Sequence, residues 1–315
     1  MLIFDTQSHP IGLMDIDRYP ASAPESVPPP TMAAVPSRYG GAPSGPRDWY
    51  VEELIAAMDE HGISQSIVMC GGTQATNENL AEAVRLHPDR LLAFASYGHR
   101  EPDSRDATTI ASVVASLDRG LGQLGFKGVG EIHVDRFSPV PPTRLHVELR
   151  PILDACRRYA VPVYFHTGFD RVTFRLKRSG EEGSSWRYHP APLPYRDPIY
   201  LDALALEYPD VPILVGHMGG RFLRHFEGAL MLALRHRNVY LTTPNVPGEI
   251  IARAVGEVGA QRVIWGSDWA LARPLHGAAL AALEEAGLTP AQKEAILGRN
   301  LADLLGVAVP GVNGW

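Results

Sequence analysis

The sequence predicts a single-domain α/β fold, a (β/α)8 TIM barrel over residues 1–315, on two observations. Eight short apolar runs rich in β-branched and aromatic residues alternate with longer amphipathic stretches. Continuous apolar strands between helices are typical of a parallel sheet that helices cover. The second observation is length, because eight right-handed β–α units in one chain of 315 residues favour a closed barrel over an open sheet.

Each element follows from a local pattern of apolar residues and of residues that begin or end helices. The predicted strands are 2–5, 66–70, 91–97, 125–134, 161–166, 211–217, 238–242 and 262–268. The predicted helices are 48–61, 76–87, 106–122, 143–159, 198–207, 220–236, 247–257, 274–286 and a closing helix at 290–305. Helix starts are indicated by Ser104 and Asp106, by Pro198, and by Thr289 followed by Pro290.

Two long segments interrupt the regular alternation of strands and helices. They are about 10–47, which is rich in Pro, Gly and Ser, and about 167–197, which carries many polar and aromatic residues. Both follow strands, so we expect both at the C-terminal face, where barrels of this kind build active sites. Long loops in compact domains usually act as lids or binding loops.

Composition and charge exclude several classes of partner. The chain has a formal charge of −6, 45% hydrophobic residues and 20% charged residues, without a basic block. We therefore expect no nucleic-acid or anionic membrane partner. The start of the chain lacks the pattern of a secretory signal, and no apolar run approaches the length of a membrane span, which predicts a cytoplasmic protein.

Residues that commonly bind metals follow four of the predicted strands. His9 comes shortly after the first strand, and His166, His217 and Asp268 end three later strands. A barrel brings these strand ends around one axis, so the four side chains are expected to converge. Imidazole and carboxylate groups suit a divalent ion such as Zn²⁺, with Mn²⁺ as the other candidate. A strand-end Asp can also take up and return a proton.

The sequence resembles the amidohydrolase-related group of the amidohydrolase superfamily, which includes aminocarboxymuconate-semialdehyde decarboxylase, resorcylate decarboxylases and pyrone-dicarboxylate lactonase. The segments that carry the resemblance are 4–9, 125–128, 163–168, 208–220, 266–269 and 296–305. The resemblance implies a TIM barrel of the metal-dependent hydrolase type with one divalent ion. A homodimer is one assembly that it allows.

The resemblance also assigns roles to the strand-end residues. His9, His166 and Asp268 look like metal ligands, Asp268 like the proton carrier, and His217 like a catalytic residue that contacts the metal-activated water or the substrate. The first strand of the group usually carries two ligands, spaced i and i+2. This chain has Gln7 at the first of these positions, and a neutral amide is a weaker ligand that could leave the metal site incomplete.

Two further sets of residues are candidates for the site. Glu131 lies on the fourth predicted strand and could compensate for Gln7 as a metal ligand, or pair with Lys127 or an arginine instead. Arginines suit substrate carboxylates, and an indole can stack on a ring. The candidate substrate-binding residues are Arg171, Arg175, Arg187, Tyr188, His189, Trp269 and Arg273, with Arg196 beside them.

Three functions compete for these residues. The leading expectation is hydrolysis of a small cyclic ester, amide or related C–N or C–O bond by a metal-activated water, with Asp268 as proton shuttle. The alternative is non-oxidative decarboxylation of an aromatic or unsaturated carboxylic acid, a lyase reaction in which Asp268 or His217 protonates carbon. The third is a metal-free barrel that binds ligands or catalyses without metal, because of Gln7.

Overall fold

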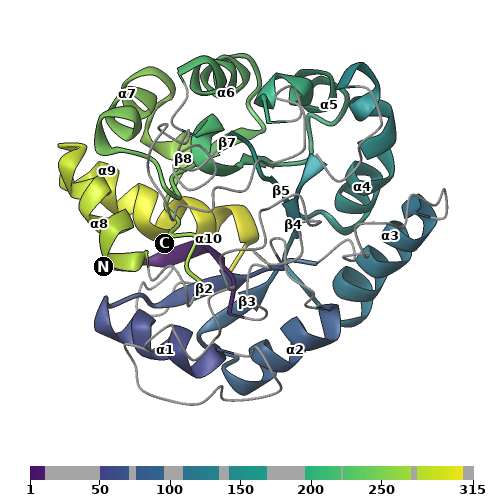
Figure 1. Cartoon of the computed structure of the whole chain (residues 1–315), viewed down its shortest axis with the longest axis horizontal. Helices are drawn as coiled ribbons and strands as arrows, with labels where there is room; N and C mark the ends of the chain where they lie inside the picture. The colour runs from purple at the N-terminus through teal and green to yellow at the C-terminus, as the bar shows by residue number, and fades with distance from the viewer. Residues whose placement is uncertain are drawn as a thin grey trace, which may run out of the picture.

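Figure 1 shows the computed structural model, which describes residues 1–10, 50–70, 76–95, 109–134, 142–168, 196–220, 223–270 and 275–307. Within these residues, strands form an inner ring and helices surround it (Figure 1). The strands are β1 (Phe4–Ser8), β2 (Gln65–Val68), β3 (Leu91–Ala93), β4 (Val129–Ile132), β5 (Val163–Phe165), β6 (Ile213–Val215), β7 (Val239–Thr242) and β8 (Val263–Ile264). The α-helices are α1 (Val51–Glu60), α2 (Asn77–Leu86), α3 (Thr109–Asp118), α4 (Leu145–Tyr159), α5 (Asp202–Glu207), α6 (Leu223–Arg235), α7 (Gly248–Val258), α8 (His276–Glu285), α9 (Pro290–Glu294) and α10 (Asn300–Leu305).

The strands pair in parallel with their neighbours in chain order and close into a ring. Regular ladders run over β1-β2-β3 and over β4-β5-β6-β7-β8. Between β3 and β4, the backbone N–H of Ala95 donates to the carbonyl of Gly128 at 2.7 Å. Between β8 and β1, the N–H of His9 donates to the carbonyl of Trp269 at 2.8 Å. The predicted (β/α)8 barrel is therefore confirmed.

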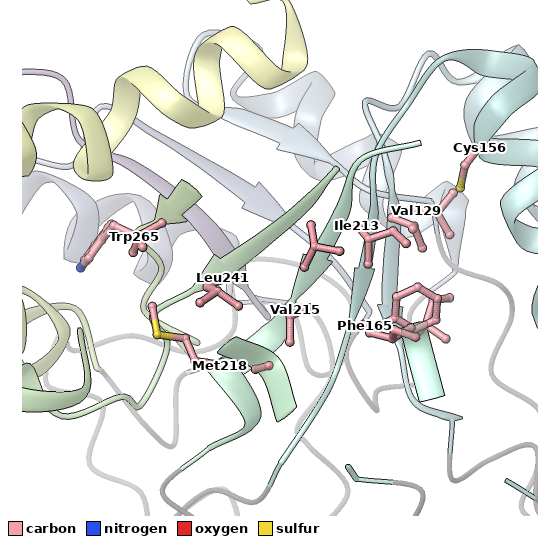
Figure 2. Packing of buried hydrophobic residues seen from close by; sticks show 14 of the residues in the cluster. Val129, Cys156, Phe165, Ile213, Val215, Met218, Leu241 and Trp265 are labelled. Carbon is pink, nitrogen blue, oxygen red and sulfur yellow. The ribbon is translucent and has the colours of Figure 1, made fainter. Parts of the chain in front are cut away.

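Alternation of side chains along the strands divides the core into two layers. The outer layer packs the strands on the helices, and Figure 2 shows part of it, with Val129, Phe165, Ile213 and Leu241 from four neighbouring strands. The inner layer fills the barrel and consists of Phe4, Ile67, Met69, Phe94, Tyr164, Leu214, Ile264, Leu301 and Ala302. The last two residues belong to α10, which therefore packs on the inner layer of the barrel.

Most predicted elements are present, with shorter strands. The start predicted at Thr289 and Pro290 is confirmed, because the Thr289 side chain accepts a hydrogen bond from the N–H of Gln292. Pro198 lies in a 3-10 turn (Pro198–Leu201) directly before α5. The helix start at Ser104 and Asp106 lies outside the described residues, as do most of the two long loops. That the whole chain 1–315 is one domain stays a prediction.

The residues that the structure describes contain no helix that is both long and apolar enough to cross a membrane.

Candidate active site

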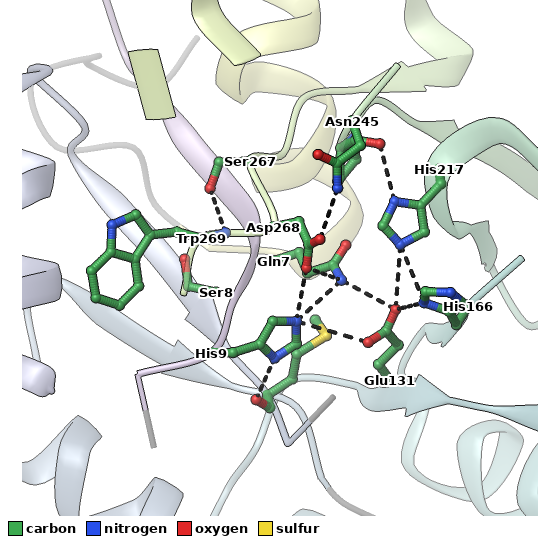
Figure 3. Close-up of polar contacts among 12 residues, drawn as sticks. Gln7, Ser8, His9, Glu131, His166, His217, Asn245, Ser267, Asp268 and Trp269 are labelled. Carbon is green, nitrogen blue, oxygen red and sulfur yellow. Dashed lines mark hydrogen bonds and ion pairs between the residues drawn. The ribbon is translucent and has the colours of Figure 1, made fainter. Parts of the chain in front are cut away.

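Six of the predicted site residues meet at the C-terminal ends of the strands. Gln7 is on β1, Glu131 is on β4, and the other four follow β1, β5, β6 and β8 directly or within a few residues (Figure 3). The four are His9, His166, His217 and Asp268. The expected convergence of sequence-distant side chains is thus present, whereas the role of each residue stays a prediction.

His9 joins β1 to β2 and to Asp268. Its Nδ1 lies 3.0 Å from the carbonyl of Met69, which can only accept, so Nδ1 carries a hydrogen. Its Nε2 lies 3.2 Å from Oδ1 of Asp268 and 3.8 Å from Oε2 of Glu131. Burial lowers the pKa of His9, but the hydrogen bond to Asp268 and the two carboxylate charges outweigh burial, so the pKa is raised.

Glu131 is a buried carboxylate surrounded by imidazoles. Its Oε1 lies 2.5 Å from Nδ1 of His166 and 3.6 Å from Nε2 of His217, and its Oε2 lies 3.1 Å from Nε2 of His133. Burial raises the pKa of Glu131, but the charges of His166 and His133 prevail and hold it well below its usual range. Burial lowers the pKa of His166 to about 3, against the opposing charge of Glu131. The lowered pKa favours the ionised carboxylate of Glu131, which is the form that binds cations.

Gln7 lies at the centre of the cluster and is fully buried. Its Nε2 donates to Oε1 of Glu131 and to Oδ1 of Asp268, both at 3.1 Å, and lies 3.2 Å from Nε2 of His9. Its Oε1 accepts from the hydroxyl of Tyr164 at 2.5 Å. Burial and the charge of Glu131 raise the pKa of Tyr164 well above its usual value, so this hydroxyl keeps its proton and stays a donor.

Asp268 is the proton carrier expected from the sequence, and donors approach both of its oxygens. Gln7 donates to Oδ1, and Nδ2 of Asn245 donates to Oδ2 at 2.8 Å. The backbone of Asp268 has φ 58° and that of Asn245 has φ 59°, both in the left-handed region. Non-glycine residues rarely adopt this region, and it often marks functional sites. The two residues are held in these conformations with their side chains in contact.

His217 is also aimed by a left-handed backbone, with φ 59°. Its Nδ1 donates to the carbonyl of Pro244 at 3.0 Å, which leaves Nε2 facing His166 at 3.2 Å. The segments that follow β5 and β6 approach closely because Gly168 and Gly219 pack backbone to backbone. A Cβ at Gly168 would lie 2.0 Å from the carbonyl carbon of Gly219. The glycines thus bring the ends of β5 and β6 together.

Two of the inward-facing site residues lie where strand register is irregular. The β1–β2 register shifts between Asp5 and Ser8, which spans Gln7. The β4–β5 register shifts between Val129 and Ile132, which spans Glu131. Bulges next to active sites re-aim side chains, and here the irregular stretches place the amide and the carboxylate side by side.

Sequence reasoning missed three residues of the site. His133 approaches Glu131 and stacks on His166, with ring centroids 4.4 Å apart. Its spacing of two residues from Glu131 could have pointed to it, since positions i and i+2 of a strand share a face. Tyr164 lies within the apolar run of β5 and Asn245 lies after β7, and no local pattern marks either residue.

The predicted substrate-binding residues fall into two groups. Trp269 is fully buried, stacks on His276 and points away from the centre of the cluster (Figure 3), so it fills the interior next to β1 and β8. Arg196 is buried as well. Its charge lowers the pKa of His166, although burial and the charges of Glu131 and His133 have larger effects on that pKa. Those outside the described residues are Arg171, Arg175, Arg187, Tyr188, His189 and Arg273.

One group of described residues could hold a metal ion. Glu131, His133 and His166 offer a carboxylate oxygen and two imidazole nitrogens that all lie within 4.8 Å of one another. These three residues are thus a candidate site for a divalent ion, and the set differs from the expected one because it includes His133. His9 and Asp268 lie on the other side of Gln7, where the amide nitrogen contacts both.

Comparison with known proteins places the chain among enzymes. The model of the family described as Amidohydrolase matches residues 5–307. Gamma-resorcylate decarboxylase from Polaromonas sp. (strain JS666 / ATCC BAA-500) is 24% identical over 272 residues, which cover 72% of this chain and 79% of that protein.

Two solved structures share the fold. That of 2,6-dihydroxybenzoate decarboxylase from Rhizobium has a TM-score of 0.61 at 20% identity and covers 97% of this chain and 99% of its own. That of dihydroxybenzoic acid decarboxylase from Polaromonas sp. JS666, with bound manganese and the inhibitor 2-nitroresorcinol, has a TM-score of 0.60 at 18% identity and covers 97% of both chains.

These comparisons confirm the resemblance and correct the expected reaction. The leading expectation of hydrolysis is wrong, because the relatives with established names that match the chain are decarboxylases. The residues alone could not decide between the reactions, since both would use the same strand-end histidines and aspartate. Zinc, expected as the metal, is not specifically supported, and the related structure contains manganese.

Proposed function

This chain belongs to the amidohydrolase family, and on that premise we propose that it catalyses the non-oxidative decarboxylation of an aromatic acid with a hydroxyl group next to the carboxylate. The observation that carries the proposal is the similarity over 272 residues to gamma-resorcylate decarboxylase, whose substrate has this chemistry. The geometry supports it through a buried aspartate, Asp268, next to a cluster of imidazoles that can receive a charged substrate.

The donor set fits a divalent cation. Glu131, His133 and His166 combine one carboxylate with two imidazoles, and such mixed donors suit Mn²⁺ or Zn²⁺. We favour Mn²⁺ because a related decarboxylase structure contains manganese. The bound ion would supply positive charge facing the carboxylate and the adjacent hydroxyl oxygen of the substrate, and so orient the ring.

Asp268 is the proposed proton donor to carbon. Its carboxylic acid gives a proton to the ring carbon that bears the carboxylate. The bond between this carbon and the carboxylate then breaks, its electron pair restores the aromatic ring, and CO₂ leaves. Asp268 is left ionised, and the donors of Asn245, Gln7 and His9 around it stabilise that charge until solvent returns a proton. The net reaction consumes one proton for each molecule of CO₂.

Two cationic or polar side chains are proposed to hold the substrate. Arg196 supplies a buried positive charge close enough to His166 to affect its pKa. His217 is fixed through Nδ1 by Pro244, so its Nε2 is oriented toward the cluster and can contact a phenolic or carboxylate oxygen. A negatively charged acid therefore meets complementary charge before the proton transfer begins.

A substrate screen tests the proposal. The purified protein, loaded with Mn²⁺, is incubated with 2,6-dihydroxybenzoate, with salicylate-type acids carrying one ortho hydroxyl, and with benzoates that lack it. Liquid chromatography then follows loss of the acid and appearance of the decarboxylated phenol. We expect turnover of ortho-hydroxy acids and none of benzoates without the hydroxyl.

The screen includes lactones and cyclic amides as matched alternatives. Hydrolysis of one of these, combined with no loss of carboxylate from any hydroxybenzoate, contradicts the proposal.

An Arg196→Gln variant is expected to raise KM for the active acid about tenfold or more, whereas Arg235→Gln, at an exposed position on α6, should leave KM unchanged.

A further inference from the structure

The amide nitrogen of Gln7 lies between His9, Glu131 and Asp268, at a position where a cation could otherwise bind. Its Nε2 is 3.1 Å from an oxygen of Glu131, 3.1 Å from an oxygen of Asp268 and 3.2 Å from Nε2 of His9. The same three groups would be attractive partners for a metal ion, with bonds of about 2.0–2.2 Å. The amide nitrogen, which has hydrogens to donate and no lone pair to give, occupies the point between them (Figure 3).

Hydrogen bonding at its oxygen fixes the orientation of the Gln7 amide. Tyr164 donates its hydroxyl hydrogen to Oε1 of Gln7 at 2.5 Å, and the hydroxyl of Thr242 lies 2.9 Å from the oxygen of Tyr164. All three side chains are fully buried. A rotated amide would turn its oxygen toward two carboxylates and would lose the donor from Tyr164. Two buried acceptors facing each other are costly, so the nitrogen stays toward Glu131 and Asp268.

The other side of Glu131 offers a different environment. His133 and His166 have side chains that are 12% and 17% exposed, whereas that of His9 is 1% exposed. A catalytic ion needs an open position for the substrate, and the more exposed pair provides one. Their ligand atoms and that of Glu131 gather within 4.8 Å.

We propose that the Gln7 amide substitutes for a cation between His9, Glu131 and Asp268, and that the metal ion of this protein binds instead on the β4–β5 side, at Glu131, His133 and His166. His9 and Asp268 then form a pair that contacts no metal, which leaves Asp268 available for proton transfer. The inference rests on the placement of ligand atoms and does not depend on the decarboxylation proposed above.

Titration with Mn²⁺ alone tests this assignment. Metal-stripped protein and its variants are titrated, and free Mn²⁺ is measured by its electron paramagnetic resonance signal. We expect about one ion per chain, at least a tenfold weaker affinity in His133→Ala and His166→Ala, and a change of less than twofold in His9→Ala. His133→Asn and His9→Gln repeat the comparison with smaller changes of shape, and thermal unfolding by circular dichroism identifies any variant that does not fold.

Two results would overturn the assignment. One is a wild-type protein that binds no Mn²⁺. The other is an affinity that falls in His9→Ala as much as in His166→Ala but is unchanged in His133→Ala, which would place the ion on the β1 side with the Gln7 amide rotated. Neither result depends on turnover, so failure of the proposed reaction is seen separately.

A substitution of Gln7 itself provides a second, independent test of the metal-site assignment. Gln7→His replaces the donor amide by an imidazole that can bind a cation between His9 and Asp268. In the Gln7→His background, His9→Ala should weaken Mn²⁺ binding at least tenfold, although the same change has little effect in the wild type. Equal insensitivity to His9→Ala in both backgrounds would show that Gln7 does not keep the ion away from His9.

Discussion

Three residues of the site hold backbone conformations that cost free energy. His217, Asn245 and Asp268 have φ values of 59°, 59° and 58°. A left-handed conformation costs a non-glycine residue roughly 1–2 kcal/mol. Each of the three makes a side-chain contact that this conformation permits, with Pro244, Asp268 and His9 respectively as partners. The strain is thus concentrated at the residues assigned to chemistry, as expected for a site whose geometry is set before substrate arrives.

At this scale, Asp268→Asn tests the proton donor. The amide keeps the size of the side chain but cannot give a proton to carbon. We expect kcat to fall by about 10²–10⁴-fold, the range of general acid–base contributions, with thermal unfolding little changed. The matched control is Asp89→Asn, at an exposed position, which should leave kcat unaltered. Turnover in Asp268→Asn close to that of the wild type would remove Asp268 from the mechanism.

The sequence predicted which residue types lie at the strand ends better than it predicted the contacts that their side chains make. His9, His166, His217 and Asp268 were found because each follows an apolar run, which is a local pattern. Tyr164 differs, because its importance depends on facing inward toward Gln7 across the barrel. The spacing of His133 from Glu131 is consistent with a shared strand face, but its stacking on His166 depends on how the ends of β4 and β5 pack. Such facts arise from packing between distant segments, which one sequence does not display.

The ends of β5 and β6 act as one element that positions His166 and His217. Thr167 donates its hydroxyl to the carbonyl of Gly216 at 2.6 Å and accepts from the N–H of Gly219 at 3.0 Å. The backbone contact of Gly168 with Gly219 completes the junction. Strand positions were predictable from periodicity, whereas the observed strands are shorter because regular pairing also requires the neighbouring strand to stay in register.

Gly168→Ala tests the junction. Gly168 has φ 67°, and an added Cβ would lie 2.0 Å from the backbone of Gly219, where no flexible side chain can yield. We expect a loss of about 3 kcal/mol in the free energy of unfolding, measured by urea denaturation, and weaker Mn²⁺ binding through His166. Gly256→Ala, on α7 with nothing within 4 Å of the added Cβ, should instead stabilise by up to about 1 kcal/mol. Similar stability of the two variants would contradict the packing described here.

Closure of the whole barrel depends on a buried carboxylate that is not among the proposed metal ligands. Asp5 accepts hydrogen bonds from the N–H and the hydroxyl of Ser267, at 2.8 and 2.5 Å, and from the N–H of Gln7 at 3.1 Å. Ser8 donates to the same carboxylate, and Nε2 of His276 lies 3.2 Å from it. Asp5 therefore ties β1 to the segment that precedes Asp268 and to α8.

We expect Asp5→Asn to destabilise the barrel by about 2–3 kcal/mol, because the new amide group would face donors that had a charged acceptor. Urea denaturation measures the change, and Asp303→Asn on the exposed face of α10 is the control. An Asp5→Asn variant as stable as the control would mean that these hydrogen bonds do not hold the closure.

The site residues alone do not distinguish hydrolysis from decarboxylation. A metal site and a strand-end aspartate serve hydrolysis and decarboxylation alike, and only similarity to named relatives favours the second. The two long loops in which the sequence predicts substrate contacts lie mostly outside the described residues.

The most direct test of the proposed function follows the carboxylate carbon itself. 2,6-Dihydroxybenzoate labelled with ¹³C at the carboxylate is incubated with the Mn²⁺-loaded enzyme, and the label is observed by ¹³C nuclear magnetic resonance. We expect transfer of the label to CO₂ and bicarbonate, with one equivalent of resorcinol formed, and transfer slower by about 10²-fold or more in Asp268→Asn. Label that stays in the aromatic acid, for this and the other ortho-hydroxybenzoates of the screen, would contradict it.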